Sequence, residues 1–152
     1  MIRDQERALS LGIVLEISSM QLPTTAEYAL RATSYLAGLP EGEAVQAKVI
    51  AKETGVPPAY LSKVLRRLTV AGLLVAQKGH GGGFSLAYVP ADISFAEVLA
   101  AVGLPLDEKH CAFGWKACDP DHPCPLHPAW SSLKVNLLAW ANETSLGDVS
   151  QG

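Results

Sequence analysis

The most constraining feature of the sequence is a pair of short helical patterns separated by a glycine turn. The first pattern covers residues 46–54, Gly55 follows it, and the second covers residues 58–71. Gly55 suits the left-handed position that ends many helices. The second pattern has apolar residues at steps of three and four, namely Leu61, Val64, Leu65, Leu68 and Ala71. Two short helices joined in this way are typical of a helix-turn-helix, whose second helix contacts DNA.

A β-hairpin is predicted directly after the second helix. Residues 72–76 form a short apolar run, residues 77–83 contain four glycines, and residues 84–88 alternate large and small side chains. Together these runs indicate two antiparallel strands, and a hairpin in this position is the wing of a winged helix. An ordinary flexible hairpin loop is the alternative interpretation. The wing interpretation predicts DNA contacts from three residues at the tip, namely Lys78, Gly79 and His80.

The charge of the chain is distributed unevenly, which favours a polyanionic partner. The whole chain has a formal net charge of −3, yet residues 46–90 contain six basic residues and one acidic residue. A local basic segment in an acidic protein indicates nucleic-acid binding. Base contacts are expected from the first turns of the second helix, from Ala59, Tyr60, Ser62 and Lys63. Phosphate contacts are expected from four cations, namely Lys48, Arg66, Arg67 and Lys78.

Three further helices are predicted around this unit. A helix over residues 23–39 contains a capping-box pattern, in which Thr24 is followed by Glu27, and a shorter helix covers residues 93–102 with Ser94 as its cap. A long helix over residues 129–144 has more apolar surface than a small domain covers, which indicates a homodimer interface. The predicted fold is therefore mainly α with a small β-hairpin wing. It is a winged helix-turn-helix followed by a long C-terminal dimerisation helix.

The chain is expected to divide into five segments. They are an N-terminal extension (1–19), a winged helix-turn-helix DNA-binding domain (20–90), a connecting helix (91–109), a cysteine-rich cluster-binding loop (110–128) and a dimerisation helix with its tail (129–152). No stretch reaches the ~18 apolar residues that a membrane span requires, and acidic residues stand where a signal peptide has basic ones. Three cysteines, an odd number, do not suit a closed disulfide framework. We therefore expect a cytoplasmic protein with no membrane partner.

The cysteine-rich loop is the second candidate functional site. Three thiols and three imidazoles lie within residues 110–127, and the cysteines are spaced C-x6-C-x5-C. Thiolates select zinc, copper(I) or iron–sulfur clusters, and structural zinc sites usually use closer cysteine pairs. The wide spacing favours a cluster, and zinc binding or a direct thiol redox switch is the alternative. No nucleophile motif accompanies the cysteines, so an enzyme is not expected.

From Met20 onward the sequence resembles the Rrf-type family of bacterial winged-helix transcriptional regulators, which has IscR-like and NsrR-like members. The matching stretches are the three-cysteine loop and residues 20–31, 55–61, 78–84 and 144–148. The resemblance implies a homodimeric repressor that binds palindromic operators in double-stranded DNA. It also implies an iron–sulfur cluster through which redox state, nitric oxide or iron–sulfur status controls operator binding.

The resemblance also implies which residues hold the cluster. Cys111, Cys118 and Cys124 match the three cysteine ligands of the family, although the first spacing is one residue longer here. His127 matches the histidine that completes a 2Fe–2S site in IscR-like members, and this assignment is favoured. Glu27 matches an aspartate of NsrR-like members that reaches a 4Fe–4S cluster in the partner subunit. The preferred interpretation of Glu27 is nevertheless the helix cap described above.

Overall fold

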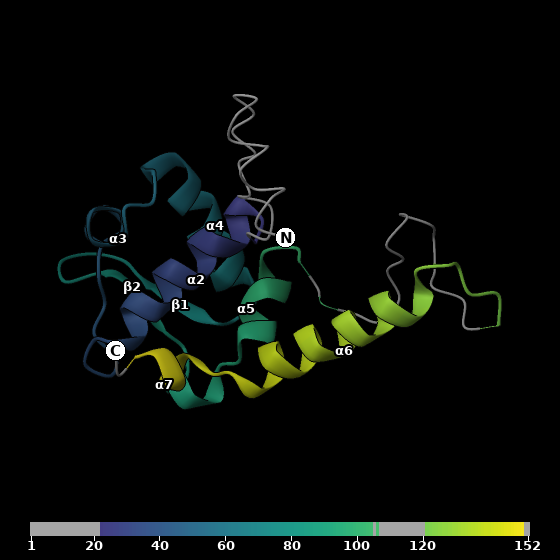
Figure 1. Cartoon of the computed structure of the whole chain (residues 1–152). Coiled ribbons are helices and arrows are strands. Elements are labelled where there is room, and N and C mark those ends of the chain that lie inside the picture. The colour runs from purple at the N-terminus through teal and green to yellow at the C-terminus, as the bar shows by residue number, and fades with distance from the viewer. Residues whose placement is uncertain (1–21, 105, 107–120, 151–152) are drawn as a thin grey trace, which may run out of the picture.

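The computed structural model describes residues 22–104, 106 and 121–150, and these are mainly helical with one two-stranded hairpin (Figure 1). The elements in chain order are α2 (Thr24–Ala37), α3 (Ala47–Thr54), α4 (Pro58–Val70), β1 (Leu74–Gln77), β2 (Gly83–Leu86), the 3-10 helix η1 (Pro90–Asp92), α5 (Phe95–Ala101), α6 (His127–Glu143) and α7 (Leu146–Val149). This order confirms the predicted fold class. Within the described residues no helix is both long and apolar enough to cross a membrane.

The helix-turn-helix forms as predicted, from α3 and α4. Gly55 ends α3 in the left-handed conformation, with φ at +69°, which a residue without Cβ adopts at low cost. Pro58 is the first residue of α4, where its missing N–H breaks no helical hydrogen bond. The apolar stripe of α4 is 0–1% exposed, at Leu61, Val64, Leu65 and Leu68. Because this stripe packs toward α2 and α3, the opposite face of α4 is turned outward.

The wing is an antiparallel hairpin of β1 and β2, in which Leu74 pairs with Leu86. The predicted hairpin is confirmed, but β1 begins at Leu74 rather than at Gly72. The last turn of α4 explains this shift, because Leu73 donates its N–H to the Leu68 carbonyl at 3.0 Å. The strand therefore begins two residues later than its composition indicated.

The wing is attached to the helix-turn-helix through a residue that precedes α3. Val45 and Phe84 exchange two backbone hydrogen bonds, of 2.9 and 2.8 Å. The two segments approach so closely that a Cβ on Gly83 would lie 2.3 Å from the Val45 carbonyl oxygen, and φ at Gly83 is +147°. The sequence pattern placed this glycine in the glycine-rich loop of the predicted hairpin. The structure shows that the chain's own packing requires it.

The N-terminus of α2 differs from the prediction. The cap residue is Pro23 rather than Thr24, and no side chain caps the helix, so the predicted capping box is wrong. Helical bonding starts one residue earlier because the Pro23 carbonyl accepts hydrogen bonds from the N–H groups of Ala26 and Glu27, at 2.8 and 3.0 Å. The Glu27 carboxylate instead forms an ion pair with Arg31, one turn further along the helix.

The C-terminal segment returns to the winged domain and completes its core. The predicted cap of α5 is confirmed, because the Ser94 hydroxyl accepts from the Glu97 N–H and the Glu97 carboxylate accepts from the Ser94 N–H. α7 lies beside this cap, since Leu146 donates its N–H to the Ile93 carbonyl at 2.9 Å. The Leu146 side chain is fully buried in the same core as α2, α4 and α5. The tail after α6 is therefore part of the winged domain.

α6 begins two residues before its predicted start and projects from the rest of the chain (Figure 1). Its C-terminal end is attached to α5, where the Trp140 ring packs edge-on against Phe95 with 5.4 Å between centroids. Along the 17 residues of this helix only Lys134 and Ala141 are buried. Large apolar side chains on or beside it are exposed, namely Leu126, Leu133, Val135, Leu137 and Trp140. A helix with so much exposed apolar surface requires a further surface to cover it.

Candidate nucleic-acid interface and metal centre

The outward face of α4 carries the residues predicted to contact DNA bases. Ala59, Tyr60, Ser62 and Lys63 are exposed, whereas Leu61 between them is 1% exposed. Because the inner face of α4 is held in a close-packed core, the outer side chains project from a fixed backbone. A recognition helix needs this arrangement to place side chains in the major groove.

Tyr60 contacts a second aromatic residue, Tyr28 on α2. Its ring lies 6.1 Å from the ring of Tyr28, at an interplanar angle of 64°, which is an edge-on contact. Tyr28 is half-buried on α2, and Tyr60 is 57% exposed. Edge-on aromatic contacts are favourable, so Tyr28 restricts the positions that the exposed Tyr60 ring adopts. The sequence signal for this contact was only that Tyr28 is an aromatic residue in the apolar stripe of this helix.

The predicted phosphate contacts surround the outward face of α4. Lys48 on α3, Arg66 on α4 and Lys78 at the wing tip are exposed, as are the neighbouring Gly79 and His80. None of these three cations forms an ion pair with another described residue. Exposed and unpaired cations are available to neutralise phosphates of a DNA backbone.

Arg67, the fourth predicted phosphate contact, has a partner within the protein. Its Nη1 donates a hydrogen bond of 2.8 Å to the Val102 carbonyl oxygen, 35 positions further along the chain. Val102 is the C-terminal cap residue of α5, where carbonyl groups lack helical partners. No spacing or periodicity in the sequence indicated this contact, because it joins two elements that are distant in the chain.

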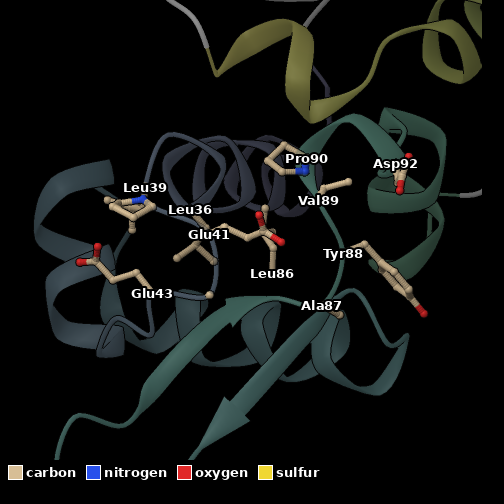
Figure 2. Close-up of a pocket in the computed structure, with 12 residues that line it drawn as sticks. Leu36, Leu39, Glu41, Glu43, Leu86, Ala87, Tyr88, Val89, Pro90 and Asp92 are labelled. Atoms are coloured by element: carbon tan, nitrogen blue, oxygen red, sulfur yellow. The ribbon is translucent and has the colours of Figure 1, made fainter.

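A separate hollow of about 390 Å³ lies between the end of α2, the loop that follows it and the segment after β2 (Figure 2). Three carboxylates, those of Glu41, Glu43 and Asp92, belong to its lining with the exposed Tyr88. No lysine or arginine is among its lining residues. Because carboxylates repel a phosphate backbone, this side of the domain does not suit DNA. The basic surface of α3, α4 and the wing is therefore the candidate nucleic-acid interface.

Two of the predicted cluster ligands share one turn at the start of α6. Cys124 has a half-buried free thiol, and its carbonyl accepts a hydrogen bond of 2.9 Å from the His127 N–H. Cys111 and Cys118 lie outside the described residues. In the part of the chain that the structure describes, no three His, Cys, Asp or Glu side chains gather in a group that could hold a metal ion. Glu27 lies on α2, in the ion pair described above.

The sequence matches known transcriptional regulators over most of its length. The model of the Rrf2 family, described as an iron-dependent transcriptional regulator, matches residues 22–152. A protein of Aquifex aeolicus that bears the name of an HTH-type transcriptional regulator is 32% identical over 127 residues, which are 82% of this chain and 88% of that protein. The IscR regulator of Vibrio atlanticus is 28% identical over 130 residues, which are 86% of this chain and 75% of IscR.

Solved structures of regulators share the fold. CymR, the global cysteine regulator of B. subtilis, has a TM-score of 0.73 at 21% identity, over 87% of this chain and 97% of CymR. IscR of T. potens has a TM-score of 0.70 at 21% identity, over 88% of each chain. Both similarities confirm the predicted winged-helix fold.

Proposed function

The chain belongs to the Rrf2 family of transcriptional regulators, and from this premise we propose that it is a repressor whose operator binding an iron–sulfur cluster controls. Membership of this family makes it a DNA-binding regulator rather than an enzyme. One observation carries the proposal: exposed, unpaired cations flank the base-reaching side chains on the outward face of α4. The partner is double-stranded DNA, and the protein works in the cytoplasm, where bacterial DNA lies.

In the proposed complex α4 is the recognition helix and enters the major groove, while the wing lies along the flanking backbone. Side chains from the first turns of α4 contact base edges, namely Ala59, Tyr60, Ser62 and Lys63. Cations around them contact phosphates, namely Lys48, Arg66 and Lys78, whereas Arg67 is bound to the Val102 carbonyl. Gly79 and His80 bring the wing tip close to the backbone. Most of the affinity is then salt-dependent, and most of the specificity comes from α4.

A homodimer would place two recognition helices on one operator. The exposed apolar side chains of α6 supply a surface that a second copy of the same helix can cover. A two-fold symmetric pair of identical subunits presents the same helix twice, so its preferred operator is a palindrome. The dimerisation helix is therefore also the element that sets the separation of the two half-sites.

The cysteine segment supplies the donor types that an iron–sulfur cluster requires. Cys124 and His127 lie on one turn, so a single site can use both side chains. With Cys111 and Cys118 they make a set of three thiolates and one imidazole, which favours a 2Fe–2S cluster. A 4Fe–4S cluster completed by Glu27 of the partner subunit is the alternative assignment. When bound, the cluster supplies a group that reacts with oxidants and nitric oxide and that is lost when iron is scarce.

The residues of this chain provide a route from the cysteine segment to DNA. α6 starts at His127, three residues after Cys124. Binding of a cluster by the cysteine segment would therefore change the position of the helix proposed to join the subunits. A shift in that helix changes the tilt and spacing of two recognition helices. A coupling free energy of about 1–3 kcal/mol between the two sites changes operator affinity about 5–150-fold.

Iron and sulfide analysis of protein purified without oxygen tests the cluster. We expect about two irons per chain and a visible absorption band in the wild type, since a 2Fe–2S centre contains two irons. Cys124→Ser and His127→Ala should lose or alter the band. His122→Ala is the matched control, because it removes an imidazole of the same segment that is not assigned as a ligand.

The same preparations test the regulation of DNA binding. Operator duplexes are selected from a random library, once with cluster-loaded and once with apo protein, because either form can be the one that binds. Affinities of both forms are then compared by fluorescence anisotropy.

In the iron analysis, about four irons per chain would instead favour Glu27 as the fourth ligand. A colourless, iron-free protein that cannot be reconstituted would contradict the cluster and leave a zinc-binding or thiol-based regulator.

A further inference from the structure

We infer that Arg67 is a positioning residue that couples the recognition helix α4 to the base of the cysteine segment. The inference deepens the proposed function and rests on it. Its structural basis is the hydrogen bond of 2.8 Å between Arg67 Nη1 and the Val102 carbonyl oxygen.

This bond is exceptional in its reach along the chain. Within residues 22–104, every other side-chain hydrogen bond joins residues no more than four positions apart, whereas Arg67 and Val102 are 35 positions apart. The other contacts between elements in this range are apolar packing and backbone bonds. Arg67 is thus the side chain that fixes the relative position of α4 and α5 by a directional interaction.

The Arg67 guanidinium and the Val102 carbonyl are chemically suited to a strong, directional hydrogen bond. Val102 caps the C-terminal end of α5, where the helix dipole is negative and carbonyl oxygens have no helical partner. A guanidinium is permanently charged, and its planar fork holds its donors in a rigid arrangement. At the other end of the side chain, Arg67 precedes the fully buried Leu68, so its backbone is held in the core. A displacement of the Val102 carbonyl is therefore transmitted to α4.

Val102 is followed by the residues that lead from α5 toward the cysteine-rich loop (110–128). Gly103 turns the chain out of α5 with φ at +89°, and Leu104 packs against the core. Cys111 lies only nine positions after Val102 in the sequence. We expect a reordering of the segment to act on the end of α5, where Arg67 is bound, as well as on α6.

Arg66 provides a matched control on the same helix. It is the adjacent arginine, it is exposed, and it forms no ion pair with another described residue. It carries the same charge as Arg67 and belongs to the same open hollow between α4 and α5, but it makes no side-chain hydrogen bond to α5. Substitutions at the two positions therefore separate coupling from phosphate attraction.

The test compares Arg67→Met and Arg66→Met with the wild type. The operator affinity of each is measured in the cluster-loaded and apo forms over a series of salt concentrations. For the wild type we expect the two forms to differ about 5–150-fold. Arg67→Met should reduce this ratio to within about twofold of unity and leave the salt slope largely unchanged. Arg66→Met should keep the wild-type ratio and lower the slope by about one.

Two results of the binding test would overturn the inference. Arg67→Met could lower the salt slope and keep the ratio, which would make Arg67 a simple phosphate contact, or it could change neither quantity. A wild-type ratio of one would instead be a failure of the proposed function. In that case amide hydrogen exchange still decides the role of Arg67. Arg67→Met should speed exchange at Gly103 and Leu104 by about threefold to tenfold, which corresponds to loss of one hydrogen bond, whereas Arg66→Met should not. Unchanged exchange in Arg67→Met would also overturn it.

Discussion

The helices α4 and α6 differ in how far their apolar side chains are buried. The apolar side chains on the inner face of α4 are 0–1% exposed, whereas Leu133 and Val135 of α6 are 48% and 53% exposed. The described residues therefore cover the apolar face of α4, but they leave that of α6 exposed. The comparison teaches that the described residues complete the surface proposed to contact DNA, whereas they leave the apolar side chains of α6 uncovered.

The largest effect on stability is expected from truncating a buried side chain of α4. Leu65→Ala should lower the free energy of unfolding by about 2–5 kcal/mol, because it opens a cavity at a fully buried position of α4. Chemical denaturation measures this loss, which should not depend on protein concentration. Val70→Ala on the same helix is the control, because Val70 is 81% exposed and its truncation should cost less than about 0.5 kcal/mol. Equal costs at both positions would break the comparison.

A second substitution tests the uncovered helix. Leu133→Asp should weaken self-association by about 2–4 kcal/mol, because a charge in an apolar interface must be desolvated. Sedimentation at several protein concentrations measures the effect, and palindrome binding should weaken with it. Asn142→Asp adds the same charge at another exposed position of α6 and should leave the assembly unchanged. A Leu133→Asp protein that remains a dimer would assign the covering of α6 to another molecule.

A third test asks whether the core alone positions the outward face of α4. Tyr28→Ala should weaken operator binding about twofold to tenfold, because the edge-on contact with Tyr60 contributes about 0.5–1.5 kcal/mol. The salt slope should not change, since no charge is removed. In a Tyr60→Ala background the Tyr28 substitution should have no further effect on binding. Additive losses would show that the two rings act independently.

The smallest effect concerns the tail that ties α6 back to the domain. Hydrogen bonds from the N–H and the hydroxyl of Ser145 lower the pKa of Asp148. A carboxylate with a lowered pKa stabilises the fold above its unfolded pKa of about 3.9, and this contribution is lost as the pH falls through the folded value. Amide protection in α7 should therefore decrease in acid, below about pH 4. Asp148→Asn should remove this pH dependence without affecting α4.

The elements were predictable where the cause is local. The spacing of Leu61, Val64 and Leu68 determines the helix and its buried face, and Ser94 caps α5 because Glu97 follows three residues later. The predicted cap at Thr24 failed because the Pro23 carbonyl can already begin the helix, which leaves the threonine inside it.

The specific contacts between elements were not predictable from the sequence. Arg67 reaches Val102 across 35 positions, and Tyr28 meets Tyr60 only after α2 and α4 have packed together. The same holds for Gly83, whose requirement for glycine comes from Val45 on another segment. Periodicity describes one element at a time, so a side chain that bridges two elements appears in the sequence only as an exposed arginine or a core aromatic.

The projection of α6 gives the regulator a mechanical property. Its 17 residues make a rod roughly 25 Å long, at about 1.5 Å of rise per residue, and the rod is fixed to the domain near Trp140. The far tip lies roughly 20 Å from that anchor, so a swing of roughly 10° carries it about 3.4 Å, which equals the rise of about 3.4 Å between successive bases. In the proposed dimer this lever converts a small change of crossing angle into a shift of one base step. The distance between half-sites, rather than the bases within them, then becomes the feature of an operator that distinguishes one regulatory state from the other.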